Sequence, residues 1–137
     1  MKITTEGTPP QRQSPFAAGA DLKTLNNHHF HVGAVKRVGT GLKLAIPDSH
    51  VGLVFARSSL FAKTGLQLTN SVGVIDSDYR GEIMIELKNE SDKPTRIMAG
   101  DRIAQLVIVP IATPTFTQGD LDVTQRGDGG FGSTGNQ

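Results

Sequence analysis

Apolar residues recur at every second position along two stretches of the chain, the pattern of a β-strand that buries one face. In residues 42–46 two leucines and an isoleucine occupy alternate positions, with a lysine on the opposite face. Residues 82–88 repeat this order, with Ile83, Ile85 and Leu87 on the apolar face. Both stretches are therefore predicted to be half-buried strands.

Further short strands are predicted where runs of Val, Ile and Leu are bounded by turn residues. They cover residues 2–4, 35–38, 51–56, 72–75, 95–98 and 103–109, with a loop at 7–15 and a turn at 47–50. The run 103–109 is apolar at nearly every position, as in a strand covered on both faces, and Gln105 is the exception. A glutamine there either bonds to the backbone within the core or faces a ligand.

Three of the four histidines, His28, His29 and His31, lie in a stretch that also contains two asparagines. A metal site would need a further ligand at suitable spacing, whereas a polar turn rich in Asn is the commoner setting. Residues 26–31 are therefore predicted to form a turn without a metal.

Composition favours a single all-β domain. The chain has 137 residues, with sixteen glycines, seven prolines and no tryptophan, which suits short strands joined by many turns. The formal net charge is +1 without a basic stripe, so nucleic acid is not an expected partner. Cysteine is absent, which excludes disulfides and thiolate chemistry. No apolar run is long enough for a membrane span and residues 1–6 lack a signal-peptide pattern, so a cytoplasmic protein is expected.

The stretch 69–83 contains the densest group of side chains that could take part in catalysis. An apolar run, 72–75, breaks into a turn with two carboxylates, the only tyrosine, an arginine and a glycine, and then resumes as a strand. A turn held between strands fixes a carboxylate closely enough for general-base catalysis. Asp76 is the first candidate for that base, and Asp78 is the second.

An anion site is indicated where the predicted strand 51–56 ends. Arg57 and two serines follow it and are predicted to open a short helix through Phe61 and Ala62, so a guanidinium, hydroxyls and backbone amides meet in one place. The alternative is an N-cap serine beside a surface arginine. Asp21 stands alone among small apolar residues and either caps a turn or holds a cation or an arginine.

The tail 126–135 is too rich in glycine to order itself. It is either an unstructured terminus or a ligand-binding arm, because its arginine, phenylalanine and two hydroxyls could grip phosphates and stack on a base. It is not a Walker A loop, since the Lys-Ser/Thr ending is missing.

Five ordered blocks of the sequence resemble the trimeric dUTPases, the deoxyuridine triphosphate nucleotidohydrolases. The blocks are residues 18–22, 57–60, 73–81, 100–106 and 126–135, of which the third and fifth are distinctive. Two positions depart from the usual family pattern: Ala56 replaces a proline, which is expected to loosen the phosphate site without removing a ligand group, and Phe61 replaces a small residue.

The resemblance implies a jelly-roll-like β-barrel over residues 1–121 and a flexible C-terminal arm over residues 122–137. It further implies a homotrimer with three shared active sites. In that family the first, second and fourth blocks come from one chain, the third from a second chain and the fifth from the tail of a third. The arm would then close over a bound nucleotide as a lid.

The same resemblance implies the reaction. Asp76 would activate the water that attacks the α-phosphorus of dUTP, which gives dUMP for dTMP synthesis and keeps uracil out of DNA. Asn70 and the hairpin backbone would select uracil, Tyr79 would pack on the deoxyribose, and Mg²⁺ would bind the triphosphate with Asp21 reaching it through water. The implied substrate-binding residues are Arg57, Ser58, Ser59, Asn70, Tyr79, Met84, Gln105, Arg126, Phe131, Gly132, Ser133 and Thr134.

Two other functions are compatible with parts of the pattern. A dCTP deaminase shares the fold and the arginine-serine block, but it requires a glutamate that acts on the ring and a different set of groups facing the base. A non-catalytic nucleotide-binding regulatory protein is the second alternative. The intact Asp76, Tyr79, Arg126 and Phe131 favour hydrolysis over both.

Overall fold

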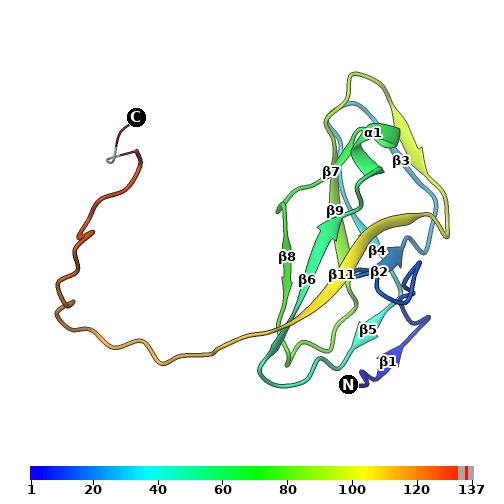
Figure 1. Ribbon diagram of the computed structural model, residues 1–137. Coiled ribbons are helices and arrows are strands. Elements are labelled where there is room, and N and C mark those ends of the chain that lie inside the picture. Colours follow the sequence, from blue (N-terminus) through cyan, green and yellow to red (C-terminus); the bar gives the residue numbers. More distant parts are fainter. Residues whose placement is uncertain (133–134, 136–137) are drawn as a thin grey trace.

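Two antiparallel sheets form the body of the computed structural model, which describes residues 1–132 and 135 (Figure 1). The larger sheet has the strand order β2-β11-β6-β8 and the smaller has the order β4-β9-β7. Their strands are β2 (Ala20–Lys23), β11 (Arg102–Pro110), β6 (His50–Ala56), β8 (Gly73–Ile75), β4 (Val35–Gly39), β9 (Met84–Asn89) and β7 (Leu66–Leu68).

Two short strand pairs and one helical turn complete the fold. β1 (Thr5–Glu6) pairs with β5 (Lys43–Leu44), and β3 (His28–Phe30) pairs with β10 (Thr95–Ile97). The helix α1 (Leu60–Thr64) follows β6 and ends at Gly65, whose positive φ of 70° suits a glycine C-cap.

The hydrophobic core lies between the two main sheets. Its buried cluster combines Leu22, Val54 and Leu106 from the larger sheet with side chains from the smaller one, such as Val38 and Leu87. The predicted alternation is confirmed in residues 42–46 and 83–87, where every second side chain is buried. The all-β fold class is therefore confirmed.

Several predicted strand limits were wrong. The strand expected at 2–4 lies instead at Thr5–Glu6, and only Lys43–Leu44 of the stretch 42–46 is paired as a strand. The turn predicted for 26–31 is also wrong, because His28–Phe30 forms a strand against Thr95–Ile97 and Phe30 is fully buried. Pairing with a distant segment outweighs the local turn preference of the asparagines.

Two strands, β2 and β7, were not predicted at all. They are four and three residues long. A segment that short contains one or two alternations, which is too few to separate a strand from a loop.

The chain beyond β11 leaves the body as an extended arm without helix or strand from Ile111 to Gly132 (Figure 1). The backbone amide of Ile111 donates to the carbonyl of Ser49 at 2.9 Å and fixes the start of the arm. Further along, Phe116, Leu121 and Val123 are at least 90% exposed. Whether the domain ends at residue 121 stays a prediction. Across residues 1–132 and 135 no helix has the length and apolar character needed to cross a membrane.

Asn89 at the end of β9 is a buried polar side chain with 1% of its surface exposed and several partners. Its amide nitrogen donates to the carbonyls of Phe30, His31 and Lys93, and its oxygen accepts from the backbone amide and hydroxyl of Ser91. One side chain therefore joins β9 to β3 and to the turn before β10.

We expect Asn89→Ala to lower the free energy of unfolding by about 2–4 kcal/mol, because it leaves several buried backbone groups without a partner. Urea denaturation followed by circular dichroism measures this change. Asn26→Ala, at an exposed position, is the control and should stay within about 0.5 kcal/mol of the parent. Equal stability of the two variants would contradict the role given to Asn89.

Candidate functional site

Three strands of the larger sheet bring Asp21 and two arginines together. Asp21 on β2 is 8% exposed, and its Oδ1 lies 3.2 Å from Nε of Arg57, which follows β6. Its other oxygen, Oδ2, lies 3.5 Å from Nη1 of Arg102 at the start of β11. Of the roles left open for Asp21, the structure shows the one in which it holds arginine.

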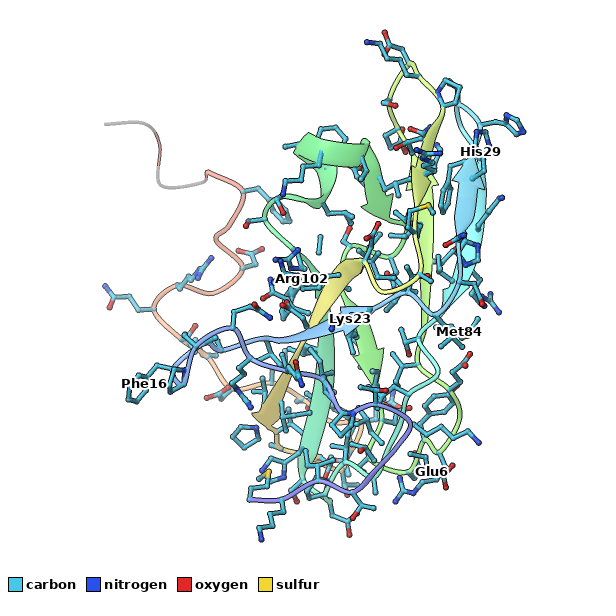
Figure 2. The ribbon with its side chains drawn as sticks, turned by 90° about the vertical axis from the view of Figure 1, so that its right-hand side faces the viewer. Glu6, Phe16, Lys23, His29, Met84 and Arg102 are labelled. Carbon is cyan, nitrogen blue, oxygen red and sulfur yellow. The ribbon has the colours of Figure 1, made fainter. Side chains whose placement is uncertain are left out.

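Arg102 was not predicted as a site residue. It lies beside Lys23 on the neighbouring strand β2, as Figure 2 shows. The β2–β11 register shifts between Arg102 and Ala104, and such an irregularity re-aims the side chain next to it. The sequence signal was present, because Arg102 stands inside the fourth block, but nothing local indicated that it would meet Asp21.

Gln105 stands opposite Asp21 on one side of β11 and opposite Phe55 on the other. Its Nε2 donates to the carbonyl of Ala56 at 3.0 Å, so of the two roles left open for Gln105 the structure shows a backbone bond, and the second amide hydrogen is left for another acceptor. A Cβ atom at Gly19 would overlap the Gln105 Oε1, so any larger residue there would require the Gln105 side chain to move. Ala56 pairs with Ala104 on β11, and the loosening of the phosphate site expected from this residue stays a prediction.

The residues after β6 form a tight turn into α1, in which the amide of Leu60 donates to the carbonyl of Arg57 at 3.1 Å. Ser58 is exposed, and Ser59 occupies the N-cap position without a side-chain capping bond. The predicted short helix is confirmed, whereas the serine N-cap interaction is not observed. Phe61 lies 53% exposed on α1, and nothing in the structure assigns it an effect.

Arg57 and Arg102 line a cavity of about 300 Å³ that we call the arginine cavity. Ser59 and Lys63 also line it, and Asp101 is its one acidic lining residue among those described. The carboxylate of Asp101 already accepts a bond from the amide of Met98 at 2.9 Å. Three cationic side chains around one cavity favour a ligand with several negative charges.

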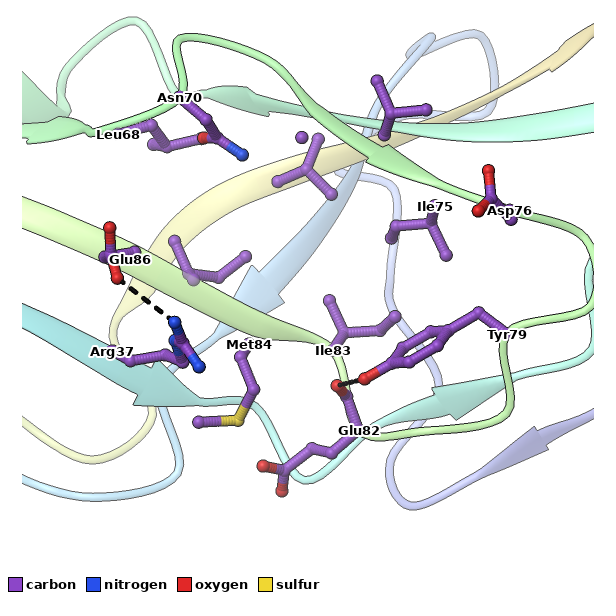
Figure 3. A pocket seen from close by; sticks show the side chains of 14 residues that line it. Arg37, Leu68, Asn70, Ile75, Asp76, Tyr79, Glu82, Ile83, Met84 and Glu86 are labelled. Carbon is purple, nitrogen blue, oxygen red and sulfur yellow. Dashed lines mark hydrogen bonds and ion pairs between the residues drawn. The ribbon is translucent and has the colours of Figure 1, made fainter.

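A second cavity, of about 320 Å³, lies between the β8 turn and β9, and we call it the hairpin cavity (Figure 3). It brings together Asn70, Asp76, Tyr79 and Met84, all predicted site residues. Asp76 directly follows β8, and the amide of Tyr79 donates to its carbonyl at 3.1 Å. Asp76 is therefore placed on a closed turn with its side chain on the cavity wall.

The ring of Tyr79 is held across Gly81. Its hydroxyl donates to the carbonyl of Glu82 at 2.9 Å, as the dashed line in Figure 3 shows. A Cβ atom at Gly81 would lie 2.5 Å from the ring carbon Cζ, which is too close for two non-bonded carbon atoms. Glycine at this position is what allows the ring to lie flat along the turn.

The two cavities share no lining residue among the described parts of the chain. Of the predicted phosphate-binding residues, Arg57 and Ser59 line the arginine cavity and Ser58 and Gln105 do not, whereas the predicted base-side residues Asn70, Tyr79 and Met84 line the hairpin cavity. The arm reaches neither. Arg126 donates to the carbonyl of Gly129 in a local turn at 2.6 Å, and Phe131 and Gly132 are exposed. Ser133 and Thr134 lie outside the described residues.

The side chains of the described residues do not form a metal site by themselves. Within residues 1–132 and 135 no group of three His, Asp or Glu side chains is placed to hold an ion. Both oxygens of Asp21 face guanidinium groups. These residues fit a magnesium ion only if a bound ligand supplies most of the oxygen donors, which is the usual way proteins bind Mg²⁺ with a nucleotide.

Comparisons with known proteins agree on one family. The family model described as dUTPase matches residues 5–135. A deoxyuridine 5'-triphosphate nucleotidohydrolase from Desulfitobacterium hafniense is 48% identical over 130 residues, which cover 92% of this chain and 86% of that protein.

Solved structures give the same result. A mutant dUTPase of Staphylococcus bacteriophage 80alpha with dUpNHpp superposes with a TM-score of 0.90 at 28% identity and covers 98% of this chain and 99% of that one. A mutant dUTPase from phage phi11 of S. aureus, described as coordinating a structural Mg(II) ion, superposes with a TM-score of 0.81 at 26% identity and covers 88% of this chain and 98% of that one.

We expect Gly81→Ala to displace the Tyr79 ring and to lower the free energy of unfolding by about 1–3 kcal/mol, because the new methyl group overlaps the ring. Tyr79 is the only tyrosine and there is no tryptophan, so the near-ultraviolet circular dichroism of tyrosine reports on this side chain alone. Gly119→Ala, where a Cβ meets no atom within 4 Å, is the matched control. An unchanged tyrosine signal in Gly81→Ala would contradict the packing described.

Proposed function

The chain belongs to the dUTPase family and hydrolyses dUTP to dUMP and pyrophosphate, and from this premise we propose that Asp76 is the general base of the reaction. The observation that carries this proposal is its place in the hairpin cavity, beside Asn70 and Tyr79. The β8 strand that precedes it pairs with β6 through Ile75 and Gly52, which fixes the backbone next to the carboxylate.

The chemical step follows from this placement. No hydrogen bond or ion pair to the Asp76 carboxylate is found in the described part of the chain, so both oxygens can accept from water. Asp76 takes a proton from a water molecule while the oxygen of that water attacks the α-phosphorus. The bond between the α-phosphorus and the oxygen that bridges it to the β-phosphorus breaks, which releases pyrophosphate. Charge then develops on the phosphate oxygens, where fixed donors lower the barrier most.

The arginine cavity supplies those donors. Arg57 and Ser59 on its wall bind the phosphate chain. The adjacent Ser58 hydroxyl and the amide hydrogen of Gln105 that Ala56 does not use donate to the same group. Asp21 pairs with Nε of the Arg57 guanidinium fork, and Arg57 lines the cavity. Bidentate binding of phosphate oxygens suits this fork.

The hairpin cavity holds the nucleoside. The side chain of Asn70 and the neighbouring backbone bond to the uracil edge, and Met84 lines the wall beside them. The Tyr79 ring, held by its hydroxyl bond to Glu82 on the cavity wall, packs on the deoxyribose and leaves no room for a 2′-hydroxyl. Mismatched buried donors and acceptors then reject other bases far more strongly than a missing methylene would.

A complete site requires more than one chain. The two cavities share no described lining residue, and the arm with its exposed apolar side chains contacts neither. A homotrimer satisfies this geometry, with the arginine cavity of one subunit, the hairpin cavity of a second and the arm of a third at each site. Arg126, Ser133 and Thr134 then close on the γ-phosphate, Phe131 stacks on the uracil, and Gly132 lies between them in the arm.

Magnesium is the proposed cofactor, held mainly by triphosphate oxygens with Asp21 as the protein carboxylate that reaches it through water. When bound, it would neutralise charge on the phosphates. The proposed setting is the cytoplasm, where the reaction removes dUTP before it enters DNA and supplies dUMP for dTMP synthesis.

We expect Asp76→Asn to lower kcat by about 10²- to 10⁴-fold, the usual contribution of a general base, while nucleotide binding persists. Release of pyrophosphate measures turnover, and calorimetry with the α,β-imido analogue of dUTP measures binding. Asp78→Asn is the matched control on the same turn. Retained turnover in Asp76→Asn with loss in Asp78→Asn would transfer the role to Asp78.

Removal of residues 126–137 tests the arm. We expect the trimer to persist in sedimentation velocity while kcat/KM falls by about 10²-fold, since the groups that position the phosphates and exclude water are lost. Phe131→Ala in the full chain separates base stacking from phosphate contacts. Full activity of the shortened chain would reject the lid, and a stable monomer of the full chain would reject the shared site.

A further inference from the structure

Glu86 on β9 joins two other segments at one end of the hairpin cavity. Its Oε1 accepts a hydrogen bond from the hydroxyl of Thr69 at 2.7 Å, and its Oε2 lies 3.5 Å from Nη2 of Arg37 on β4 (Figure 3). Both Glu86 and Arg37 line the same cavity as Asn70 and Asp76. The carboxylate therefore belongs to the wall of the site and not to a remote surface.

The backbone adds a second connection between Thr69 and Glu86. The amide of Thr69 donates to the carbonyl of Glu86 at 3.1 Å, beyond the last β7–β9 ladder pair, Leu68 and Leu87. Thr69 is thus fastened to β9 by its main chain and by its side chain. It directly precedes Asn70, so the same two bonds fix the start of the Asn70 turn.

The other side of Asn70 is constrained by its own turn. Ser71 has a positive φ of 59°, which is uncommon for a serine, and the amide of Val72 donates back to the carbonyl of Asn70. Beyond it, a Cβ atom on Gly73 would lie 3.6 Å from Asn70 Nδ2. The orientation of Asn70 therefore depends on a strained turn on one side and on the Thr69–Glu86 connection on the other.

The partners of Glu86 also determine how much hydrogen-bond acceptor capacity its carboxylate has left for a base. A carboxylate without partners is a strong acceptor and would attract the exocyclic amino group of cytosine, whereas uracil has a carbonyl oxygen at that position. With one oxygen bound by Thr69 and the other by Arg37, the carboxylate has less acceptor capacity left. The arrangement disfavours an amino group and tolerates a carbonyl.

We propose that Glu86 is a positioning residue for base selection, which orients Asn70 through Thr69 and whose pairing with Thr69 and Arg37 disfavours cytosine. This inference rests on the proposed function, in which the hairpin cavity holds the base. Thr69 and Arg37 are the other two members of the arrangement. A purely structural role is disfavoured by exposure, because the side chains of Arg37 and Glu86 are 68% and 39% exposed and such pairs contribute little to stability.

The test uses Thr69→Val, which removes the hydroxyl at nearly constant volume, and Thr69→Ser, which restores it. Binding of the α,β-imido analogues of dUTP and dCTP by calorimetry, and KM and kcat for dUTP, are the measurements. We expect Thr69→Val to raise KM and to reduce the dUTP-to-dCTP affinity ratio by about tenfold, the size of one hydrogen bond, with kcat within about twofold. Thr69→Ser should restore both values to within about twofold of the parent.

Glu86→Gln provides an independent variant, because it removes the charge and keeps an acceptor for Thr69. We expect a smaller loss of the affinity ratio than in Thr69→Val. Glu90→Gln is the matched control, since Glu90 pairs with Lys88 at 3.1 Å at similar exposure and lies outside the cavity.

An unchanged affinity ratio in Thr69→Val would overturn the proposal, as would a fall in kcat with unchanged KM. The binding ratio does not depend on which carboxylate activates water. A failure here is therefore distinguishable from a failure of the role given to Asp76.

Discussion

The hydrogen-bonded ladder of β11 with β2 on one side and β6 on the other is the constraint on which the arginine cavity depends. Gln105 stands between Asp21 and Phe55 because the registers of both ladders agree at that position. Successive side chains of a strand alternate between faces, so a slip of one residue would turn Gln105 away from Ala56 and Gly19. Backbone pairing over the length of β11 thus fixes side chains that are far apart in the sequence.

The two cavities differ in charge in a way that matches the two parts of a nucleotide. The arginine cavity is lined by three cationic side chains and suits a triphosphate. The hairpin cavity carries carboxylates, of which Glu86 is bound by Arg37. Burying the carboxylate of Asp21 carries a desolvation penalty, and removing one partner of such a pair usually lowers stability. Its presence is explained by the orientation it gives to Arg57 and Arg102.

The sequence predicted the fold class, the burial alternation of residues 42–46 and 83–87 and the short helix, because these are local patterns. It could not predict β2, β3 or β7, whose few residues show no clear period and whose pairing depends on other segments of the chain. It placed Asp76, Asn70 and Tyr79 in one stretch, and the structure gathers them in one cavity. It missed Arg102, Arg37 and Glu86, because a contact across a sheet depends on register and no local pattern records it.

The attachment of the arm at Ile111 has a consequence for how the proposed trimer would behave on dilution. The roughly twenty residues between that attachment and Phe131 span at most about 70 Å when fully extended. A tether of this length confines the arm to a small volume around its own oligomer, where its effective concentration is of millimolar order. In the proposed trimer, closure of the arm is then independent of the bulk protein concentration for as long as the subunits stay together.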